Sequence, residues 1–549
     1  MRSRSRWPVL SGLVLIILAL SAFWYGRNQA SGPRAPTHGG RYVEAVVGVP
    51  SNVNPLYATF NDVDKDLTAL IFSGLTRLGP DGTVLPDLAA GWDVSPDARS
   101  YIFRLRQGLT WQDGAPLTAD DVVFTCEALR DPDFRGEPSL GLFWQQVSCT
   151  KLDDLTIRFE LPQPLAPFPS YTTTGILPKH KLEGLTAEGL FLSPFNERPV
   201  GSGPFALVYM DTQRAVLQSN PAYSGGEPFI AELELRFFPD YTTAAAAFQE
   251  RSVQGLLLGP EAPPADQALL DGEGNLQHLV IRRNSYTLLF LNTRTPFLDD
   301  KAVRQAILYA LDRPTILSST LDGRADLADS PIVPGTWAYS DDIRRYAYDP
   351  QQARGLLEDD GWELNSQGML EKDGQELTLT LLTDADAARS SIGQEIVRQL
   401  GEVGIRATQE TRGDTILVRD FLLPRKFQMA LWGWDQGPDP DPYSSWHSSQ
   451  VRDQGFNLAG FADQRLDDVL SEARQTSDQE RRRTLYAEFQ QIFAEEVPSI
   501  LLFYPLYHYY VRDDVKGISL GILFDPSSRF ASANEWYIKT KRGPTPTLP

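Results

Sequence analysis

Hydrophobic and polar residues alternate along several short stretches of the chain, and this pattern predicts strands. Residues 41–47, RYVEAVV, are rich in the β-branched residues that strands favour. Residues 101–106 and 155–161 alternate in the manner of half-buried strands. Together with the helical patterns described next, these strands suggest α/β lobes with some antiparallel strands.

A second pattern, with hydrophobic residues three or four positions apart, predicts helices. Over residues 301–313 one stripe consists of Ala302, Ala306 and Ala310, so a closely packed amphipathic helix is expected. A helix over 392–400 lies between strands expected at 376–382 and 405–409. That order predicts a β-α-β unit, and the fold class is therefore α/β.

Polar residues at the starts of two helical patterns predict where those helices begin. Thr118 precedes Asp120 and Asp121 and is expected as an N-cap. Residues 477–480, SDQE, have the spacing of a capping box. They lead into a core-facing helix, whose apolar positions are Leu485, Phe489, Ile492 and Phe493.

Length and charge limit the classes of protein that the chain could belong to. Cores stop growing at about 250–300 residues, so a chain of 549 residues is expected to have at least two lobes. The formal net charge is −20. No nucleic-acid partner is expected, because such a partner needs a basic face to replace its counterions.

The N-terminus has the pattern of an export signal or a membrane anchor. Three arginines precede an uncharged apolar run over 7–25, and Arg27 ends it. A basic flank before an apolar run directs export, and the run approaches the roughly 20 residues that span a bilayer. Residues 1–26 are expected to be a cleaved signal or a membrane anchor. No cysteine follows the apolar run, so a lipoprotein anchor is not expected. Residues 27–39, rich in Gly and Pro, are expected to be a flexible linker.

The chain has two cysteines, Cys126 and Cys149, which lie 23 residues apart. Export would permit a disulfide, and the alternative is two buried thiols. Neither cysteine belongs to a C-x-x-C motif, and the five histidines show no metal-binding spacing. No cofactor and no metal are therefore expected.

Enzyme motifs are missing from the sequence, and one stretch favours ligand binding instead. Neither a G-x-S-x-G nucleophile elbow nor a glycine-rich phosphate loop is present, so no catalytic activity is expected. Residues 431–443, LWGWDQGPDPDPY, place aromatic rings and carboxylates on a backbone constrained by Gly and Pro. The alternative interpretation is a plain turn after a strand, because Gly-Pro-Asp-Pro is strong turn chemistry.

Longer segments, in a fixed order and spacing, carry a family resemblance. They are LIFSGLTRLGPDGTVLPDLAAGWDVSPDARSYIFRLRQGLTWQDGAPLTADDVVFT (70–125), GSGPF (201–205), NPAY (220–223), LFLNTRTPFLDDKAVRQAILYALDR (289–313) and YDPQQARGLLEDDGW (348–362). With the stretch at 431–443, they resemble the extracytoplasmic solute-binding proteins of ABC importers. The group is the oligopeptide- and dipeptide-binding one, family 5, and the match covers nearly all of the chain after residue 40.

The resemblance implies a two-lobed, periplasmic-binding-protein-like clamp of type II with an extra domain inserted in the first lobe. A ligand then lies between the lobes and is enclosed by hinge closure. Carried onto this sequence, the first lobe comprises 40–72, 199–282 and 515–549, the inserted domain 73–198, and the second lobe 283–514.

The resemblance also implies which residues bind the ligand. In the family's peptide binders a Gly-Trp pair at a strand end faces the ligand, and a later aspartate holds the ligand's α-ammonium. Gly433 and Trp434 match this pair, with Trp432 beside them. The family places the aspartate three positions after the tryptophan, where this chain has a glycine. Asp435 is therefore the first candidate and Asp439 the second.

Asn54 and Tyr286 occupy segments that line the ligand site in relatives, and each is equally open to a structural role. The implied function is capture of a peptide or other small solute and its delivery to a membrane permease and its ATPase. A monomer is expected, outside the cytoplasm, with residues 7–25 as a membrane attachment if they are not removed. The alternative is a membrane-anchored sensor that uses the same clamp without transport.

Overall fold

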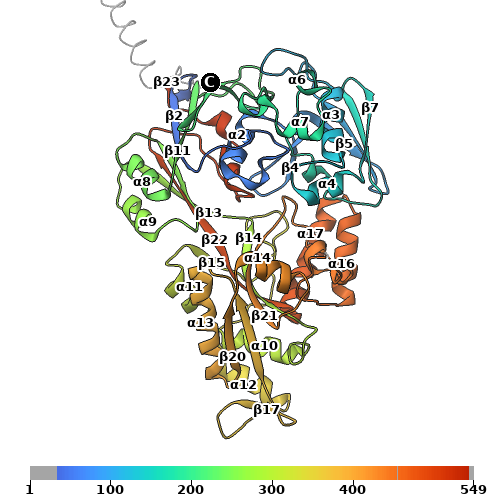
Figure 1. Ribbon diagram of the computed structural model, residues 1–549, viewed down its shortest axis with the longest axis vertical. Coiled ribbons are helices and arrows are strands. Elements are labelled where there is room, and N and C mark those ends of the chain that lie inside the picture. Colours follow the sequence, from blue (N-terminus) through green and yellow to red (C-terminus); the bar gives the residue numbers. More distant parts are fainter. Residues whose placement is uncertain (1–33, 454, 543–549) are drawn as a thin grey trace, which may run out of the picture.

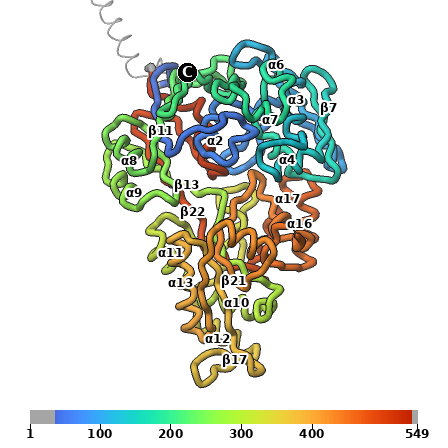
Figure 2. Tube along the Cα trace, in the orientation of Figure 1, coloured from blue at the N-terminus to red at the C-terminus, as the bar shows by residue number. Residues whose placement is uncertain are grey.

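The computed structural model describes residues 34–453 and 455–542, which form two bodies joined by a few strands (Figure 1). Both ends of the described chain contribute to the upper body, and the second half fills most of the lower body (Figure 2). The signal or anchor expected at 1–26 lies outside the described residues. Within the described part, no helix combines the length and apolar character that a membrane crossing requires.

One twelve-stranded sheet runs through both bodies. Its strands in the upper body, the first lobe, are β2 (Arg41–Val47), β9 (Phe205–Met210), β10 (Arg214–Ser219), β11 (Glu232–Phe238), β12 (Gly255–Leu258) and β13 (Leu276–Arg282). Those in the lower body, the second lobe, are β14 (Ser285–Leu291), β15 (Ala325–Leu327), β19 (Thr378–Thr383), β20 (Arg406–Thr411) and β21 (Met429–Asp435). The long strand β22 (Ser499–Arg512) pairs with members of both sets and joins them.

The chain passes between the lobes inside β22. Residues 499–503 of this strand pair with β14, whereas residues 508–511 pair with β12. The other edge of the later segment pairs with β13, from Arg512 to Leu506. The boundary expected between residues 514 and 515 therefore falls too late, because hydrogen bonding commits the end of β22 to the first lobe.

Helices cover the sheet in each lobe (Figure 1). The first lobe has α2 (Asp62–Ile71), α8 (Tyr241–Gln249) and α9 (Pro264–Asp271). The second lobe has α10 (Lys301–Ala310), α11 (Arg313–Thr320), α12 (Pro350–Asp359), α13 (Ala387–Glu402), α16 (Gln464–Gln475) and α17 (Gln479–Glu496). Short elements between them include β16 (Glu363–Leu364), β17 (Leu370–Lys372), β18 (Gln375–Glu376), α14 (Asp414–Ile416) and α15 (Tyr443–Trp446).

The segment expected as an inserted domain has a sheet of its own, in the order β5-β6-β8-β7. The strands are β5 (Ala89–Val94), β6 (Ser100–Leu105), β7 (Ser148–Asp153) and β8 (Thr156–Glu160). The helices are α3 (Ala119–Arg130), α4 (Pro138–Trp144), α5 (Phe168–Tyr171), α6 (Lys179–Leu182) and α7 (Ala187–Phe191), and β3 (Thr76–Leu78) pairs with β4 (Val84–Pro86). Cys126 of α3 and Cys149 of β7 lie together as a disulfide pair, with Cα atoms 6.6 Å apart.

The local sequence signals are confirmed in part. The β-α-β unit is present, because β19 and β20 pair in parallel on either side of α13. Thr118 caps α3 as predicted and forms a capping box with Asp121. The predicted start of α17 is wrong by one residue, since the cap is Asp478, whose side chain accepts hydrogen bonds from the backbone of Glu480 and Arg481.

Two other expectations are corrected by the structure. The helix predicted over 301–313 ends at Ala310, because Asp312 caps a new helix that has proline in its first turn. Part of the expected flexible linker is a strand, β1 (Arg34–Pro36), which pairs with β23 (Thr540–Arg542) near the chain's other end.

Buried apolar residues form separate cores in the two lobes. Two clusters draw their fully buried members from residues 42–281 and 507–536. Two others draw their buried members from residues 286–504 and from Ile522 of the returning chain, and the partly buried Phe524 packs against the same core. Separate cores joined by few strands are the architecture that hinge motion requires.

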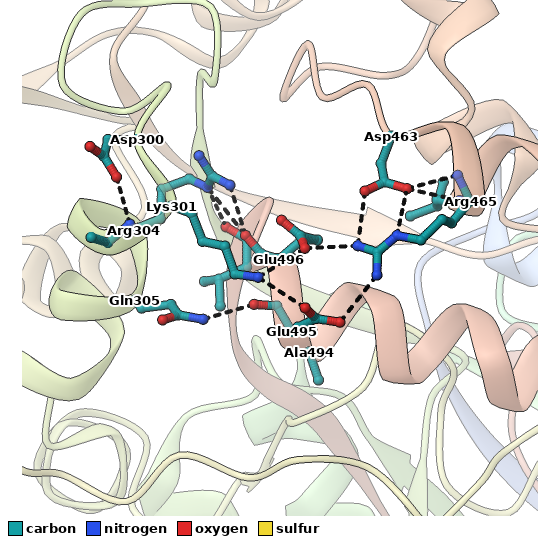
Figure 3. A network of polar contacts seen from close by, with 12 residues as sticks. Asp300, Lys301, Arg304, Gln305, Asp463, Arg465, Ala494, Glu495 and Glu496 are labelled. Atoms are coloured by element: carbon teal, nitrogen blue, oxygen red, sulfur yellow. Dashed lines mark hydrogen bonds and ion pairs between the residues drawn. The ribbon is translucent and has the colours of Figure 1, made fainter. Parts of the chain in front are cut away.

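A polar network ties three helices of the second lobe together at the end of α17 (Figure 3). Lys301 of α10 contacts both Glu495 and Glu496, and Arg465 in the first turn of α16 contacts the same two carboxylates. The buried Arg304 donates to the backbone carbonyls of Glu496 and Val497. It thereby satisfies acceptors that a helix end leaves unpaired.

A second network lies buried inside the first lobe. The guanidinium of Arg529 donates to Glu44 of β2 at 2.8 Å and to both carboxylate oxygens of Asp66 in α2. Tyr509 of β22 donates to the other oxygen of Glu44 at 3.0 Å. Two carboxylates thus share one cation, and burial raises the pKa of Asp66 to about 6, although Arg529 acts to lower it.

A variant with Cys126→Ala and Cys149→Ala is expected to have a free energy of unfolding lower by about 3 kcal/mol. The disulfide joins residues 23 positions apart, and closing a loop of that length lowers the entropy of the unfolded chain. Urea denaturation of both proteins measures this difference. Mass spectrometry of unreduced peptides provides the control, and two alkylated free thiols in the wild type would contradict the pairing.

Acidification from pH 7.5 to 5 is expected to stabilise the Asp66 cluster. A carboxyl whose folded pKa is raised contributes stability at low pH, and this contribution is lost as the pH rises through about 6. Asp66→Asn should remove a contribution of about 1 kcal/mol between these pH values. Urea denaturation of both proteins at each pH tests this, and a pH-independent difference would show that Asp66 keeps one protonation state.

Candidate functional site

The end of β21 has two faces with different surroundings. In the register with β14, Trp432 lies opposite Leu288 and Trp434 opposite Tyr286. Successive strand residues point to opposite faces, so both tryptophans share one face, while Gly433 and Asp435 share the other. The sequence stretch singled out above therefore lies at a strand end, as predicted.

The two tryptophans are half-buried, and each packs against neighbouring side chains. Trp434 contacts Phe290 and Phe456 edge to face, with ring centroids 6.3 and 6.1 Å apart. The guanidinium of Arg389 lies over the ring of Trp432, 5.6 Å from its centroid. Phe456 is itself an exposed aromatic residue, so an aromatic surface extends beyond the strand.

Gly433 leaves room on the opposite face. A Cβ atom built on this residue would meet only the hydroxyl of Thr287, at 4.0 Å, in the part of the chain that the structure describes. The residue is half-buried, so the space lies at the protein's margin. A side chain here would fill that space without disturbing the fold.

Asp435 lies beyond this space and is exposed, with 68% of its side chain accessible. Its carboxylate accepts a hydrogen bond from Arg283 at 3.1 Å. Arg283 also donates to the hydroxyl of Tyr507 in β22, at 3.0 Å. The first candidate for ammonium binding therefore already has a cationic neighbour, which lies between β13 and β14 where the chain enters the second lobe.

Asp439, the second candidate, is held in an internal ion pair. Its side chain and that of Arg482 in α17 are each 7% exposed, and Arg482 donates to both carboxylate oxygens. Asp441 similarly accepts from Arg474 of α16 at 2.8 Å. The prediction for Asp439 is corrected, because its charge is compensated inside the protein.

Asn54 and Tyr286 have structural contacts. Asn54 is fully buried, and its side-chain amide donates to Asn196 and accepts from the backbone of Leu56. Tyr286 is 2% exposed in the second-lobe core, where burial raises its pKa to about 12. Neither side chain lies at an open surface, so of the two interpretations the structural one applies here.

The inserted segment touches the second lobe beside this turn. The backbone of Ala166 donates to Arg474 at 2.8 Å, and that of Trp337 donates to Asp81 at 3.0 Å. A cavity of about 130 Å³ lies at this contact, lined by residues that include Trp92, Tyr101, Trp337 and the Asp439–Arg482 pair. It is smaller than the pockets of about 300 Å³ or more that hold most ligands.

The sequence did not predict the three arginines that form ion pairs with the carboxylates of this region. Arg283, Arg474 and Arg482 lie 152, 33 and 43 positions from their carboxylate partners. No short motif carries such pairings. The one available signal was the presence of Arg283 just before a segment already expected to lie near the ligand.

Two lobes with separate cores, an added subdomain and an aromatic strand end with an exposed carboxylate define a two-lobed binding protein. The chain matches the family model of bacterial extracellular solute-binding proteins, family 5 (middle), over residues 83–455. It belongs to this family.

Relatives cover almost the whole chain. It is 28% identical to the oligopeptide-binding protein AppA of Bacillus subtilis, over 98% of this chain and 99% of that protein. The structure of AppA with a nonapeptide superposes with a TM-score of 0.67 at 29% identity, covering 92% of this chain and 100% of the other. NikZ from Campylobacter jejuni, solved with Ni(L-His), gives 0.68 at 28% identity, covering 90% and 99%.

Gly433→Val is expected to weaken ligand binding at least tenfold while leaving the unfolding temperature nearly unchanged, because valine fits an open strand position and fills the space beside Asp435. Calorimetry with a bound ligand and thermal unfolding measure the two effects. Gly91→Val in β5 is the matched control, since a Cβ there also meets nothing within 4 Å. Equal affinity of Gly433→Val and wild type would place the ligand elsewhere.

Proposed function

We propose that this protein is the solute-binding component of an ABC importer and that it captures a peptide between its lobes. Family membership supports extracellular solute binding, and a nonapeptide complex is known for AppA, a relative that matches nearly the whole chain. The peptide delivered in this way would pass to permease subunits driven by an ATPase. No catalytic step is part of this function.

The observation that carries the proposal is the arrangement at the end of β21. Half-buried aromatic rings on one face, an open space at Gly433 and an exposed carboxylate at Asp435 lie within four consecutive residues. Aromatic rings offer contact area that is tolerant of side-chain identity. A carboxylate at the end of such a surface can hold an ammonium group through charge-assisted hydrogen bonds.

The position of this site couples binding to lobe movement. Arg283 and Tyr507 lie on the two neighbouring segments that cross between the lobes. A ligand that contacts Asp435 of the second lobe and α2 of the first would favour the closed arrangement, because only that arrangement provides both surfaces. Closed, ligand-bound protein is then the form that a permease would recognise.

Attachment to the membrane through residues 7–25 and a monomeric state complete the proposal. The apolar run after three arginines supports the attachment. The monomeric state is part of the expectation carried by the family resemblance. Mass spectrometry of the mature N-terminus in the native host tests the attachment.

Native mass spectrometry of the freshly purified protein, followed by calorimetry of ligand-stripped protein, tests peptide capture. Peptides of two, three, five and nine residues should include at least one length that binds with micromolar or tighter affinity. Ni(L-His) is the comparison ligand, because a relative of similar identity was solved with it. Binding of the nickel complex and of no peptide would overturn the proposal.

Asp435→Asn is expected to weaken binding of peptides with a free amino terminus by about tenfold or more, since a charge-assisted hydrogen bond is lost. N-acetylated peptides should bind the variant and the wild type alike. Asp93→Asn, which alters another exposed ion pair far from β21 in the chain, is the control. An equal loss for free and acetylated peptides would contradict an ammonium contact at Asp435.

A further inference from the structure

Arg283 occupies the junction of three chain segments that pass between the lobes. Its backbone donates to Pro505 of β22, and it forms an isolated bridge with Leu523 of the returning chain. Its guanidinium reaches forward to Tyr507 and to Asp435, at 3.0 and 3.1 Å. The arginine is therefore fixed at its base, and its charged end lies at the proposed ligand site.

The turn that carries Asp435 is fixed against the same segment. The backbone of Gln436 donates to the carbonyl of Asn284, and the side chain of Asn284 donates to the carbonyl of Gly437 at 2.9 Å. Asn284 is itself buried. Asp435 and Arg283 therefore keep their separation, and a positive and a negative group stand side by side at a defined distance.

Neither group has used its full hydrogen-bonding capacity. In the described ranges, only one carboxylate oxygen of Asp435 has a partner, and Nε of Arg283 is buried without an acceptor. The pair is also partly open to solvent, with side-chain exposures of 25% for Arg283 and 68% for Asp435. Ion pairs of this kind are weak, so a ligand with matching charges can replace the mutual contact.

We propose that Arg283 and Asp435 form a dipolar subsite that selects peptides beginning with aspartate or glutamate. The α-ammonium would bind Asp435, and the carboxylate of the first side chain would bind Arg283. This inference rests on the proposed function and narrows its substrate class. When the first side chain of a peptide has no carboxylate, its α-ammonium has to compete with Arg283 for Asp435. When the first residue is acidic, its side-chain carboxylate replaces Asp435 as the partner of Arg283.

Other charges near the pair are compatible with this preference. Asp62, in the first turn of α2, is close enough to influence Arg283 and is itself paired with Lys65 at 2.9 Å. Arg283 therefore offers a ligand carboxylate a guanidinium whose own partner, Asp435, is an exposed carboxylate. Arg474 and Arg482, by contrast, are committed to Asp441 and Asp439.

Calorimetry with four peptides of the length that binds best tests the inference. They differ only in the first residue, which is aspartate, asparagine, alanine or lysine. The wild type should bind the aspartate peptide about tenfold more tightly than the asparagine peptide, which corresponds to one charge-assisted hydrogen bond. Arg283→Gln should reduce this ratio to about one while still binding the alanine peptide.

Arg282→Gln is the matched control. Arg282 is the preceding residue and is also ion-paired, with Asp326 at 2.6 Å, but it lines a different pocket with His278. This variant should keep the tenfold preference. Thermal unfolding of both variants checks that each is folded.

The outcomes separate this inference from the proposed function. Equal wild-type affinity for the aspartate and asparagine peptides, or an unchanged ratio in Arg283→Gln, would overturn the dipolar subsite and leave peptide capture standing. Failure of all four peptides to bind the wild type would overturn the subsite alone, whereas peptide capture is overturned only if no peptide of two to nine residues binds. A preference for the lysine peptide would show that Asp435 acts alone.

Discussion

Both lobes depend on one strand, β22, which is shared between their sheets. The first residues of β22 complete the sheet of the second lobe, and its last residues complete the sheet of the first. Thirteen of its fourteen residues are buried, so each core loses a wall if the strand is displaced. Because the strand is continuous, any relative movement of the lobes must be absorbed near its centre, where its partner changes from β14 to β13. The proposed ligand contacts lie beside this same point.

Buried ion pairs link elements of the structure in both lobes. In the first lobe, Arg529 links β2, α2 and the returning chain through Glu44 and Asp66. In the second, Arg482 and Arg474 fix the turn after β21 through Asp439 and Asp441. Breaking such a pair costs more than forming it gains, because one charge is then left buried. The two pairs of the second lobe therefore hold the turn after β21 in one position, which keeps Trp434 and Asp435 in place.

Local chemistry and family pattern were visible in the sequence, and pairings between distant residues were not. The Thr118 cap depends on neighbours within a few positions, and the β-α-β unit depends on three consecutive elements with regular hydrophobic patterns. The structure confirms both. The family could be predicted because the segments typical of it stand in this sequence in a fixed order and spacing. The sequence did place the Gly-Trp pair at a strand end. It could not show that Asp439 is buried against Arg482, that Asn54 is enclosed, or that Arg283 stands beside Asp435. Each of these depends on how remote segments pack. Assigning the end of β22 also required its hydrogen-bond partners.

The pairing of β1 with β23 has a separate consequence for engineering. Arg34 lies opposite Arg542 in an antiparallel ladder, so a short linker could connect the two ends of the described chain without crossing the molecule. New ends could then be opened at the hairpin between β16 and β17, at the far tip of the second lobe (Figure 1). Exposed loop tips are the sites where circular permutation succeeds. Such a permutant would move both termini to the lobe opposite the one that carries them now.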